Sequence, residues 1–141
     1  MNPIDDVISY AEKFIGVPYM WGGNTPHRGL DCSGFIIEIL KAFCVVHSRD
    51  DMTAQQIYQR LLRDGENTAP NVSRGQILFF GKGTGAITHI GLAVSSHRMI
   101  EAGGGDSSIV NAELADKATA FVRIRGIRQD LVASILPNYV S

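Results

Sequence analysis

The first half of the chain carries apolar residues at helical spacing. The pattern predicts an amphipathic helix over residues 2–16, which opens on Asn2 as N-cap followed by a first-turn proline. Residues 31–46 are apolar around most of a helical circumference, so they predict a central, buried helix. Residues 53–65 open with capping-box spacing and end on glycine, which predicts a third helix.

The period of the pattern changes after residue 65. Short segments rich in β-branched and aromatic residues alternate with Gly- and Ser-rich turns, and they predict strands over residues 76–80, 88–94, 99–102 and 121–125. Because helices gather in the first half and strands in the second, we expect an α+β fold with N-terminal helices packed on a C-terminal antiparallel sheet. We interpret residues 17–29 as a loop, and residues 131–141 as a short helix or a loose C-terminal tail.

Composition narrows the classes of function. With 141 residues, 45% of them hydrophobic, the chain is expected to form a single domain over residues 1–141. A net charge of −1 provides no field for nucleic acid or an anionic membrane, so neither is expected as a partner. No apolar run is long enough to cross a bilayer, and two cysteines are too few for a disulfide framework. We therefore expect a soluble protein.

Cys32 is the strongest candidate for chemistry. It lies in the first turn of the predicted buried helix, where free backbone N–H groups and the helix dipole favour a thiolate. The carboxylate of Asp31 opposes that charge unless it caps the helix or binds a substrate cation. The alternative for Cys32 is an unreactive small residue in the core, which is our interpretation of Cys44, deep in the same helix.

A cysteine nucleophile needs a base, and His89 is the favoured candidate among four histidines. His27, His47 and His97 fall in loops or turns, where surface positions explain them. His89 instead lies inside a predicted strand, and the small residues on its face leave room for the start of the Cys32 helix. The alternative is a half-exposed histidine without a catalytic role.

An imidazole base works better when a third group holds its ring and tautomer. With a three-residue hairpin loop, Glu101 on the next strand lies opposite His89 on the same face and accepts the far ring N–H. Asp106, which follows three glycines, is a rival for this role. The alternative for Glu101 is a solvated glutamate on an edge strand.

Two further patterns give weaker signals. Residues 81–85 (GKGTG) look like a phosphate-binding loop but lack its spacing, so we predict a hairpin loop there. The cysteines and histidines do not have the paired spacing of a zinc site. We therefore expect neither a metal nor another cofactor.

The candidate residues belong to an ordered set of motifs that resembles the NlpC family of papain-like cysteine peptidases, which cut peptides in the bacterial cell wall. The resemblance covers residues 4–127 and rests on PYMWGG at 18–23, DCSGF at 31–35, GQILFF at 75–80, HIGL at 89–92 and FVRIR at 121–125. It implies a papain-like domain that hydrolyses peptidoglycan stem peptides, often at the bond between γ-D-glutamate and a diamino acid.

By this resemblance, Cys32 is the nucleophile and His89 the base. Glu101 matches the residue that orients the histidine, although many relatives carry His, Asn or Gln there. Tyr19 matches a tyrosine that helps to hold the site or the oxyanion. Gln76 replaces a common aspartate, which we interpret as the loss of a structural turn contact.

Asp31 and Ser33 match positions that, in relatives, recognise the free amine of a stem peptide. Peptidoglycan stem peptides or muropeptides are therefore the expected partners. An amidase or acyltransferase on the same scaffold, and a non-catalytic wall-binding or phage-tail structural module, are the alternatives. Since no signal peptide is visible, we expect synthesis in the cytoplasm, with delivery to the wall by a phage tail or secretion machinery or action on recycled muropeptides.

Overall fold

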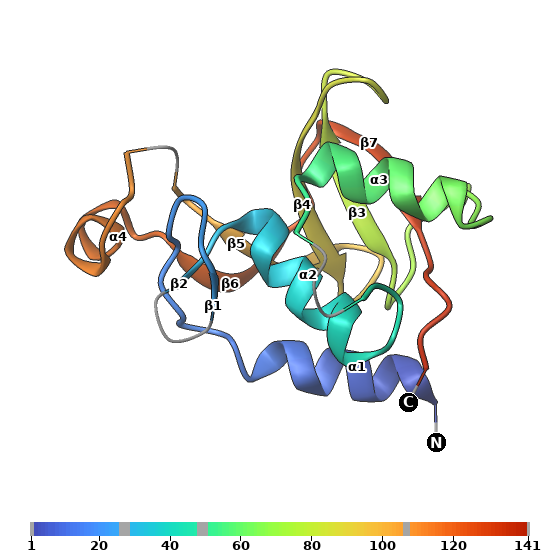
Figure 1. Ribbon diagram of the computed structural model, residues 1–141, viewed down its shortest axis with the longest axis horizontal. Helices are drawn as coiled ribbons and strands as arrows, with labels where there is room; N and C mark the ends of the chain where they lie inside the picture. Colours follow the sequence, from blue (N-terminus) through green and yellow to red (C-terminus); the bar gives the residue numbers. More distant parts are fainter. Residues whose placement is uncertain (1, 26–28, 48–50, 106–107, 141) are drawn as a thin grey trace.

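The computed structural model describes residues 2–25, 29–47, 51–105 and 108–140 (Figure 1). The helices are α1 (Pro3–Glu12), α2 (Cys32–Ala42), α3 (Ala54–Arg63) and α4 (Ala112–Ala118). A small hairpin of β1 (Asn24–Thr25) and β2 (Gly29–Leu30) precedes α2. The main sheet contains β3 (Ile77–Gly81), β4 (Ile87–Ala93), β5 (Arg98–Gly103), β6 (Phe121–Gly126) and β7 (Leu131–Ile135).

The main sheet is antiparallel, in the order β6-β5-β4-β3-β7. Helix α2 lies at the centre of the molecule and contacts α1, α3, β4 and β5 (Figure 1). The main core therefore lies between the helices and one face of the sheet, and a smaller apolar cluster covers the other face. This arrangement confirms the expected α+β class, with the N-terminal helices packed on the sheet. Within the described ranges, no helix has the length and apolar character to span a membrane.

Capping residues set the helix starts that the sequence predicts. Asn2 accepts a hydrogen bond from the N–H of Ile4, which opens α1. At α3, Thr53 and Gln56 exchange side-chain to backbone hydrogen bonds, so the predicted capping box is present. Residues 82–86 form the turn between β3 and β4, as predicted for most of the GKGTG segment.

Helix α2 confirms the prediction of a central helix but is shorter than expected. Its buried residues surround most of its circumference: Gly34, Phe35, Ile36, Ile37, Ile39 and Leu40. The helix ends at Ala42, and Cys44 follows in a left-handed backbone conformation with a φ of 60°. Cys44 is exposed, so its interpretation as part of the core is wrong.

The end of the chain is neither a helix nor a loose tail. Residues 131–135 form β7, which extends the sheet beside β3. Tyr139 is buried, and its hydroxyl donates a 2.7 Å hydrogen bond to the carbonyl of Gly75. The N–H of Val140 donates to the carbonyl of Phe43. These contacts anchor the end of the chain against the helical layer.

The β1–β2 hairpin and helix α4 lie where no helix or strand is predicted. The segment interpreted as a loop, residues 17–29, contains β1 and the start of β2. Helix α4 begins after Asn111, whose side chain accepts a hydrogen bond from the N–H of Leu114. Both elements are short, and their apolar patterns are too brief to identify.

Candidate active site

Cys32 is the first residue of α2, and its sulfur lies beside β4, near the end of the paired region of β4 and β5. The ladder between β4 and β5 ends at the pair of Leu92 with Ile100. Beyond that pair, the backbone N–H of Ile90 donates to the Cys32 sulfur, together with the N–H of Cys32 itself and that of the next residue. The sulfur therefore lies beside the part of β4 that carries the candidate base.

His89 points away from the main core because it alternates with Ile90 along β4, and a bulge next to it returns Ile87 to the core. Thr88 is the extra residue in the ladder between β3 and β4, so Ile87 and Ile90 both belong to the main core. The imidazole of His89 packs instead near the ring of Phe80, with 5.7 Å between ring centroids. Its side chain is 13% exposed, so it is more buried than the half-exposed alternative requires.

The structure brings His89 and Glu101 together. The Nε2 atom of His89 lies 2.6 Å from Oε1 of Glu101. The prediction that Glu101 lies directly opposite His89 is wrong, however, because the register pairs Leu92 with Ile100. Continuing that register sets Glu101 opposite Gly91, on the face of His89 but diagonal to it.

The missing side chain of Gly91 makes room for this diagonal contact. A Cβ atom there would lie 3.0 Å from the sulfur of Met99 and 3.7 Å from Cβ of Glu101. The small residue beside His89 therefore accommodates β5. It does not accommodate the start of the Cys32 helix, which packs on the other face, so that part of the sequence interpretation is wrong.

Glu101 is a buried carboxylate with three cationic or potentially cationic partners. Its side chain is 1% exposed, and its second oxygen, Oε2, lies 3.2 Å from Nη2 of Arg123 and 3.5 Å from Nη1 of Arg125. Burial raises the pKa of Glu101, but the hydrogen bond and charge of His89 and the two guanidinium groups together hold it below its ordinary value. An ionised Glu101 accepts the N–H of Nε2 and leaves Nδ1 of His89 as the basic ring nitrogen.

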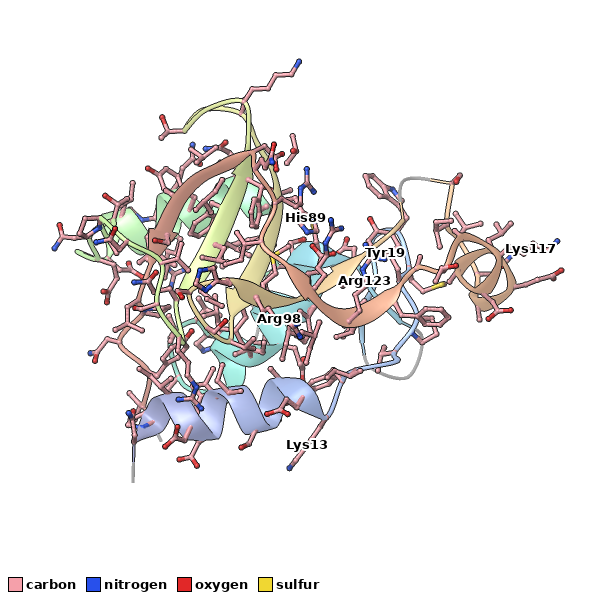
Figure 2. The ribbon with its side chains drawn as sticks, turned by 180° about the vertical axis from the view of Figure 1, so that it is seen from behind. Lys13, Tyr19, His89, Arg98, Lys117 and Arg123 are labelled. Atoms are coloured by element: carbon pink, nitrogen blue, oxygen red, sulfur yellow. The ribbon has the colours of Figure 1, made fainter. Side chains whose placement is uncertain are left out.

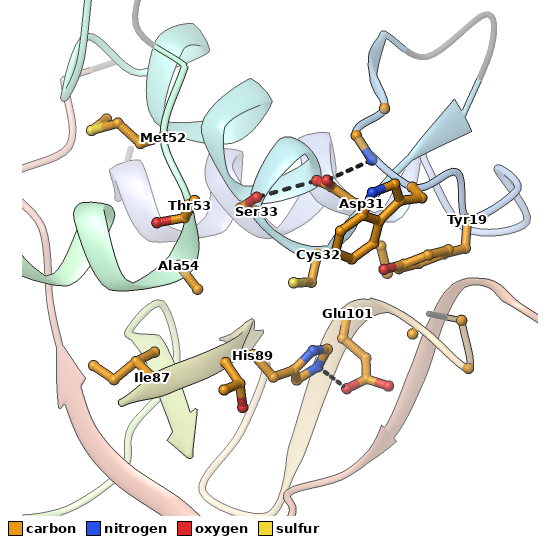
Figure 3. A pocket seen from close by; sticks show the side chains of 18 of the residues that line it. Tyr19, Asp31, Cys32, Ser33, Met52, Thr53, Ala54, Ile87, His89 and Glu101 are labelled. Carbon is orange, nitrogen blue, oxygen red and sulfur yellow. Dashed lines mark hydrogen bonds and ion pairs between the residues drawn. The ribbon is translucent and has the colours of Figure 1, made fainter. Parts of the chain in front are cut away.

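Cys32, His89 and Glu101 line one cavity of about 850 Å³ (Figure 3). The sulfur and the imidazole face the same space between the start of α2 and the sheet. The loop before α2, the start of α3 and the glycines after β5 complete the walls. A cavity of this size accommodates several residues of a peptide.

Burial dominates the protonation of Cys32. Together with the negative charge of Asp31, it raises the pKa of the thiol to about 12. The backbone N–H groups of Cys32, Ser33 and Ile90 lower the pKa, as the helix-start argument expects, but by less. The helix start therefore favours the thiolate as expected, but burial and the Asp31 carboxylate outweigh it and raise the pKa of the thiol.

Asp31 caps α2 with both of its oxygens in use. Oδ1 accepts the N–H of Gly34 at 2.7 Å and the hydroxyl of Ser33 at 3.2 Å, and Oδ2 accepts the N–H of Gly22 at 3.1 Å. Burial raises the pKa of Asp31, while these hydrogen bonds lower it in part. Asp31 and Ser33 both line the cavity, so the structure places them where a bound molecule would meet them (Figure 3).

Tyr19 is held in the wall of the cavity by its backbone and its ring. Its N–H donates to the carbonyl of Ala120, and a Cβ atom on Gly105 would collide with its aromatic ring. The side chain is 5% exposed and lies on the same side of the cavity as Glu101 (Figure 3). Its role in holding an oxyanion stays a prediction.

The other histidines do not join this site in the described ranges. His47 is exposed, and His97 lies in the turn between β4 and β5, where its Nδ1 contacts the hydroxyl of Ser96 at 2.8 Å. His27 and Asp106, the rival orienting residue, lie outside the described residues. Among the residues that are described, no three potential metal ligands form a group.

Gln76 corrects one interpretation. Its side chain is buried, with Oε1 accepting the N–H of Ser73 at 3.0 Å and Nε2 donating to the carbonyl of Asn71 at 3.2 Å. The turn before β3 therefore keeps a side-chain contact, and its predicted loss is wrong.

Sequence reasoning missed the arginines around Glu101. Arg123 and Arg125 are two residues apart on β6, where alternation places both on one face. That spacing is visible in the sequence, but the register that pairs Arg123 with Glu101 is not. Arg125 lines the cavity, as does Arg128 from the loop after β6.

Comparison with known proteins identifies the family. A family model described as the NlpC/P60 family matches residues 16–125. The chain is 33% identical over 133 residues to the bifunctional muramidase/DL-endopeptidase CwlT of Bacillus subtilis, covering 89% of this chain and 38% of that protein. It is 35% identical over 98 residues to a gamma-D-glutamyl-L-lysine dipeptidyl-peptidase of the same organism, covering 68% of this chain and 31% of the relative. The chain thus spans about a third of the length of these relatives.

A solved structure shows the same fold over nearly the whole domain. RipD of Mycobacterium tuberculosis, described as a non-catalytic NlpC/p60 domain protein adapted to peptidoglycan binding, superposes with a TM-score of 0.66 at 18% identity. The match covers 96% of this chain and 97% of RipD. Together with the family model and the relatives, it supports the papain-like arrangement of helices and sheet expected from the sequence. The chain belongs to the NlpC/P60 family.

Proposed function

We propose that the protein is a cysteine endopeptidase that hydrolyses peptidoglycan stem peptides, at the bond between γ-D-glutamate and a diamino acid. The observation that carries the proposal is the shared cavity of Cys32 and the His89–Glu101 pair. The relatives named as endopeptidases and as a gamma-D-glutamyl-L-lysine peptidase support the substrate class.

In the proposed reaction, the resting site holds a neutral thiol, because burial raises the pKa of Cys32. The thiol proton passes to Nδ1 of His89 as the sulfur attacks the scissile carbonyl. The C–S bond forms and the C–N bond breaks, with His89 giving the proton to the leaving amine. Water then attacks the thioester, loses a proton to His89 and releases the acid and the thiol.

Glu101 keeps the imidazole in the tautomer that this reaction needs. Because its carboxylate accepts from Nε2, the lone pair of Nδ1 is available to the sulfur. The backbone N–H of Cys32, together with Tyr19, is the proposed donor set for the oxyanion, and one such donor typically contributes about 3 kcal/mol. Asp31 and Ser33 are proposed to receive the free amine of the stem peptide, whose positive charge would offset the carboxylate beside the sulfur.

A non-catalytic peptidoglycan-binding module is the second candidate. The burial of the Cys32 sulfur favours it, because burial raises the pKa of the thiol and a neutral thiol is a weaker nucleophile. An amidase or acyltransferase acting on a lipid or protein amide has less support, because glycines and polar side chains line much of the cavity where a long apolar groove would favour it.

Digestion of purified muropeptides with product identification by mass spectrometry tests the proposal. The variants are Cys32→Ala and, as a matched control, Cys44→Ala, because Cys44 is an exposed cysteine outside the cavity. We expect cleavage by the wild type and by Cys44→Ala, at the γ-D-glutamyl bond, and none by Cys32→Ala. Binding of muropeptides by all three proteins without cleavage would establish the binding module instead.

A further inference from the structure

The second oxygen of Glu101 is held by two arginines that no part of the proposed reaction uses. Arg123 approaches Oε2 with Nε at 3.3 Å and Nη2 at 3.2 Å, and Arg125 approaches with Nη1 at 3.5 Å. Arg123 is paired with Glu101 across the ladder between β5 and β6. Strand alternation and register place Arg123 on the face of His89, and Figure 2, seen from behind Figure 1, shows the two residues near each other in that view.

Two consecutive glycines leave the space for this ion pair. A Cβ atom on Gly103 would collide with the Glu101 carboxylate and lie 3.2 Å from Nη2 of Arg123. A Cβ atom on Gly104 would lie 3.2 Å from Nη1 of the same arginine. One oxygen of the Glu101 carboxylate therefore contacts His89, and the other contacts the two arginines. The two glycines next to the carboxylate have no side chains that would displace it.

The charges around His89 explain what the arginines can do. A buried carboxylate with no other cation nearby would stabilise the imidazolium form of its only partner, and an imidazolium cannot accept the thiol proton. In this protein, the two guanidinium groups beside Oε2 offset part of the negative charge of the Glu101 carboxylate. The remaining charged groups that line the cavity are Asp31, Asp51 and Arg128.

We propose that Arg123 and Arg125 are positioning residues that fix the Glu101 carboxylate and offset its charge, so that His89 stays a neutral base with Nδ1 toward Cys32. This inference rests on the proposed function, because the positioning role is a role in that reaction. Its first test uses the free protein and needs no substrate. Both arginines act through Glu101, and neither is assigned a contact with the reacting atoms.

The test is the ¹⁵N NMR signature of His89 in the free protein, which distinguishes the two neutral tautomers from the imidazolium. In Arg123→Gln we expect the ratio of imidazolium to neutral His89 at pH 7 to rise about threefold, because one of the two cations beside Glu101 is removed. Arg123→Lys keeps the charge and should restore most of the wild-type signal. Arg98→Gln is the matched control, because Arg98 is an exposed arginine at the far end of β5.

Arg125→Gln provides a second variant in case Arg123→Gln does not fold, since the Arg125 side chain is 43% exposed. If the His89 signals of both glutamine variants match the wild type, the inference is overturned. If muropeptides are cleaved, the acidic limb of kcat/KM should move to higher pH in the same variants. Altered NMR signals without muropeptide cleavage by the wild type would reject the proposed function and leave the positioning role intact.

Discussion

The Nε2 atom of His89 and the Oε1 atom of Glu101 lie 2.6 Å apart across a diagonal of the sheet. The two residues meet because Gly91, which lies between them on that face, has no side chain to separate them. The contact therefore depends on a glycine in mid-strand as much as on the two polar residues. A sequence in which position 91 carried a larger residue could keep His89 and Glu101 and still lose their contact.

Glu101→Gln should lower kcat/KM without unfolding the protein. The amide oxygen can still accept from Nε2 of His89, but the charge-assisted hydrogen bond and the ion pairs to the arginines are lost. We expect a loss of roughly tenfold, equivalent to about 1.4 kcal/mol in the transition state. Glu101→Ala, which removes the acceptor, should lose more. Steady-state kinetics on a muropeptide check both, and equal activity in all three proteins would assign the orientation of His89 to another group.

Gly103→Ala should disturb the site through a single methyl group. The added Cβ would meet the Glu101 carboxylate and push it from His89. A displaced catalytic group costs roughly 10- to 100-fold in rate, and that is the loss we expect. Gly83→Ala is the control, because nothing lies within 4 Å of a Cβ atom there. Should Gly103→Ala retain wild-type kinetics, the Glu101 carboxylate does not depend on that space.

Asp31→Asn should make the Cys32 thiol more reactive. The charge of Asp31 is the second-largest cause, after burial, of the raised pKa of Cys32, so removing it favours the thiolate. Asparagine still caps the helix. In a Cys44→Ala background, we expect iodoacetamide to modify Cys32 at pH 7 roughly three times faster or more. Mass spectrometry of the intact protein gives the rate, with the exposed Asp116→Asn as control. An unchanged rate would show that the sulfur does not sense this carboxylate.

Acid should destabilise the wild type more than the Glu101→Gln variant. The pKa of Glu101 in the folded protein lies below its ordinary value of 4.5, so its ionised form contributes stability above that pH. This contribution is lost as the pH falls below about 4.5 through the folded pKa, whereas glutamine has no proton to gain. Asp31, with its raised pKa, acts in the opposite direction but is present in both proteins. Thermal denaturation at several pH values from about 6 to 3 measures the difference, which should be absent if Glu101 is not ion-paired in solution.

Local chemistry explains why parts of the fold were predictable. The capping box at Thr53 and the apolar circumference of α2 depend only on residues close in sequence, and both are confirmed. The strands β3 to β6 were also found, because their alternating or apolar runs are bounded by glycine and serine. The class of fold followed from the order of these elements.

What the sequence could not provide is register and backbone conformation. The bulge at Thr88 turns Ile87 toward the core, and the ladder pairs Arg123 with Glu101, yet neither follows from the local pattern. Cys44 looked like a core residue because an apolar run continues past the point where the helix ends. The strand β7 was missed because its partner, β3, is some fifty residues away in the chain and supplies the hydrogen bonds that define it.

The position of the Cys32 sulfur beside β4 has a consequence for when the candidate site forms. The helix start that carries the sulfur is made early in synthesis, whereas both strands that receive it come from the second half of the chain. A nascent or truncated chain therefore has a cysteine but no imidazole beside it. The candidate site therefore forms only when the two halves of the chain pack together.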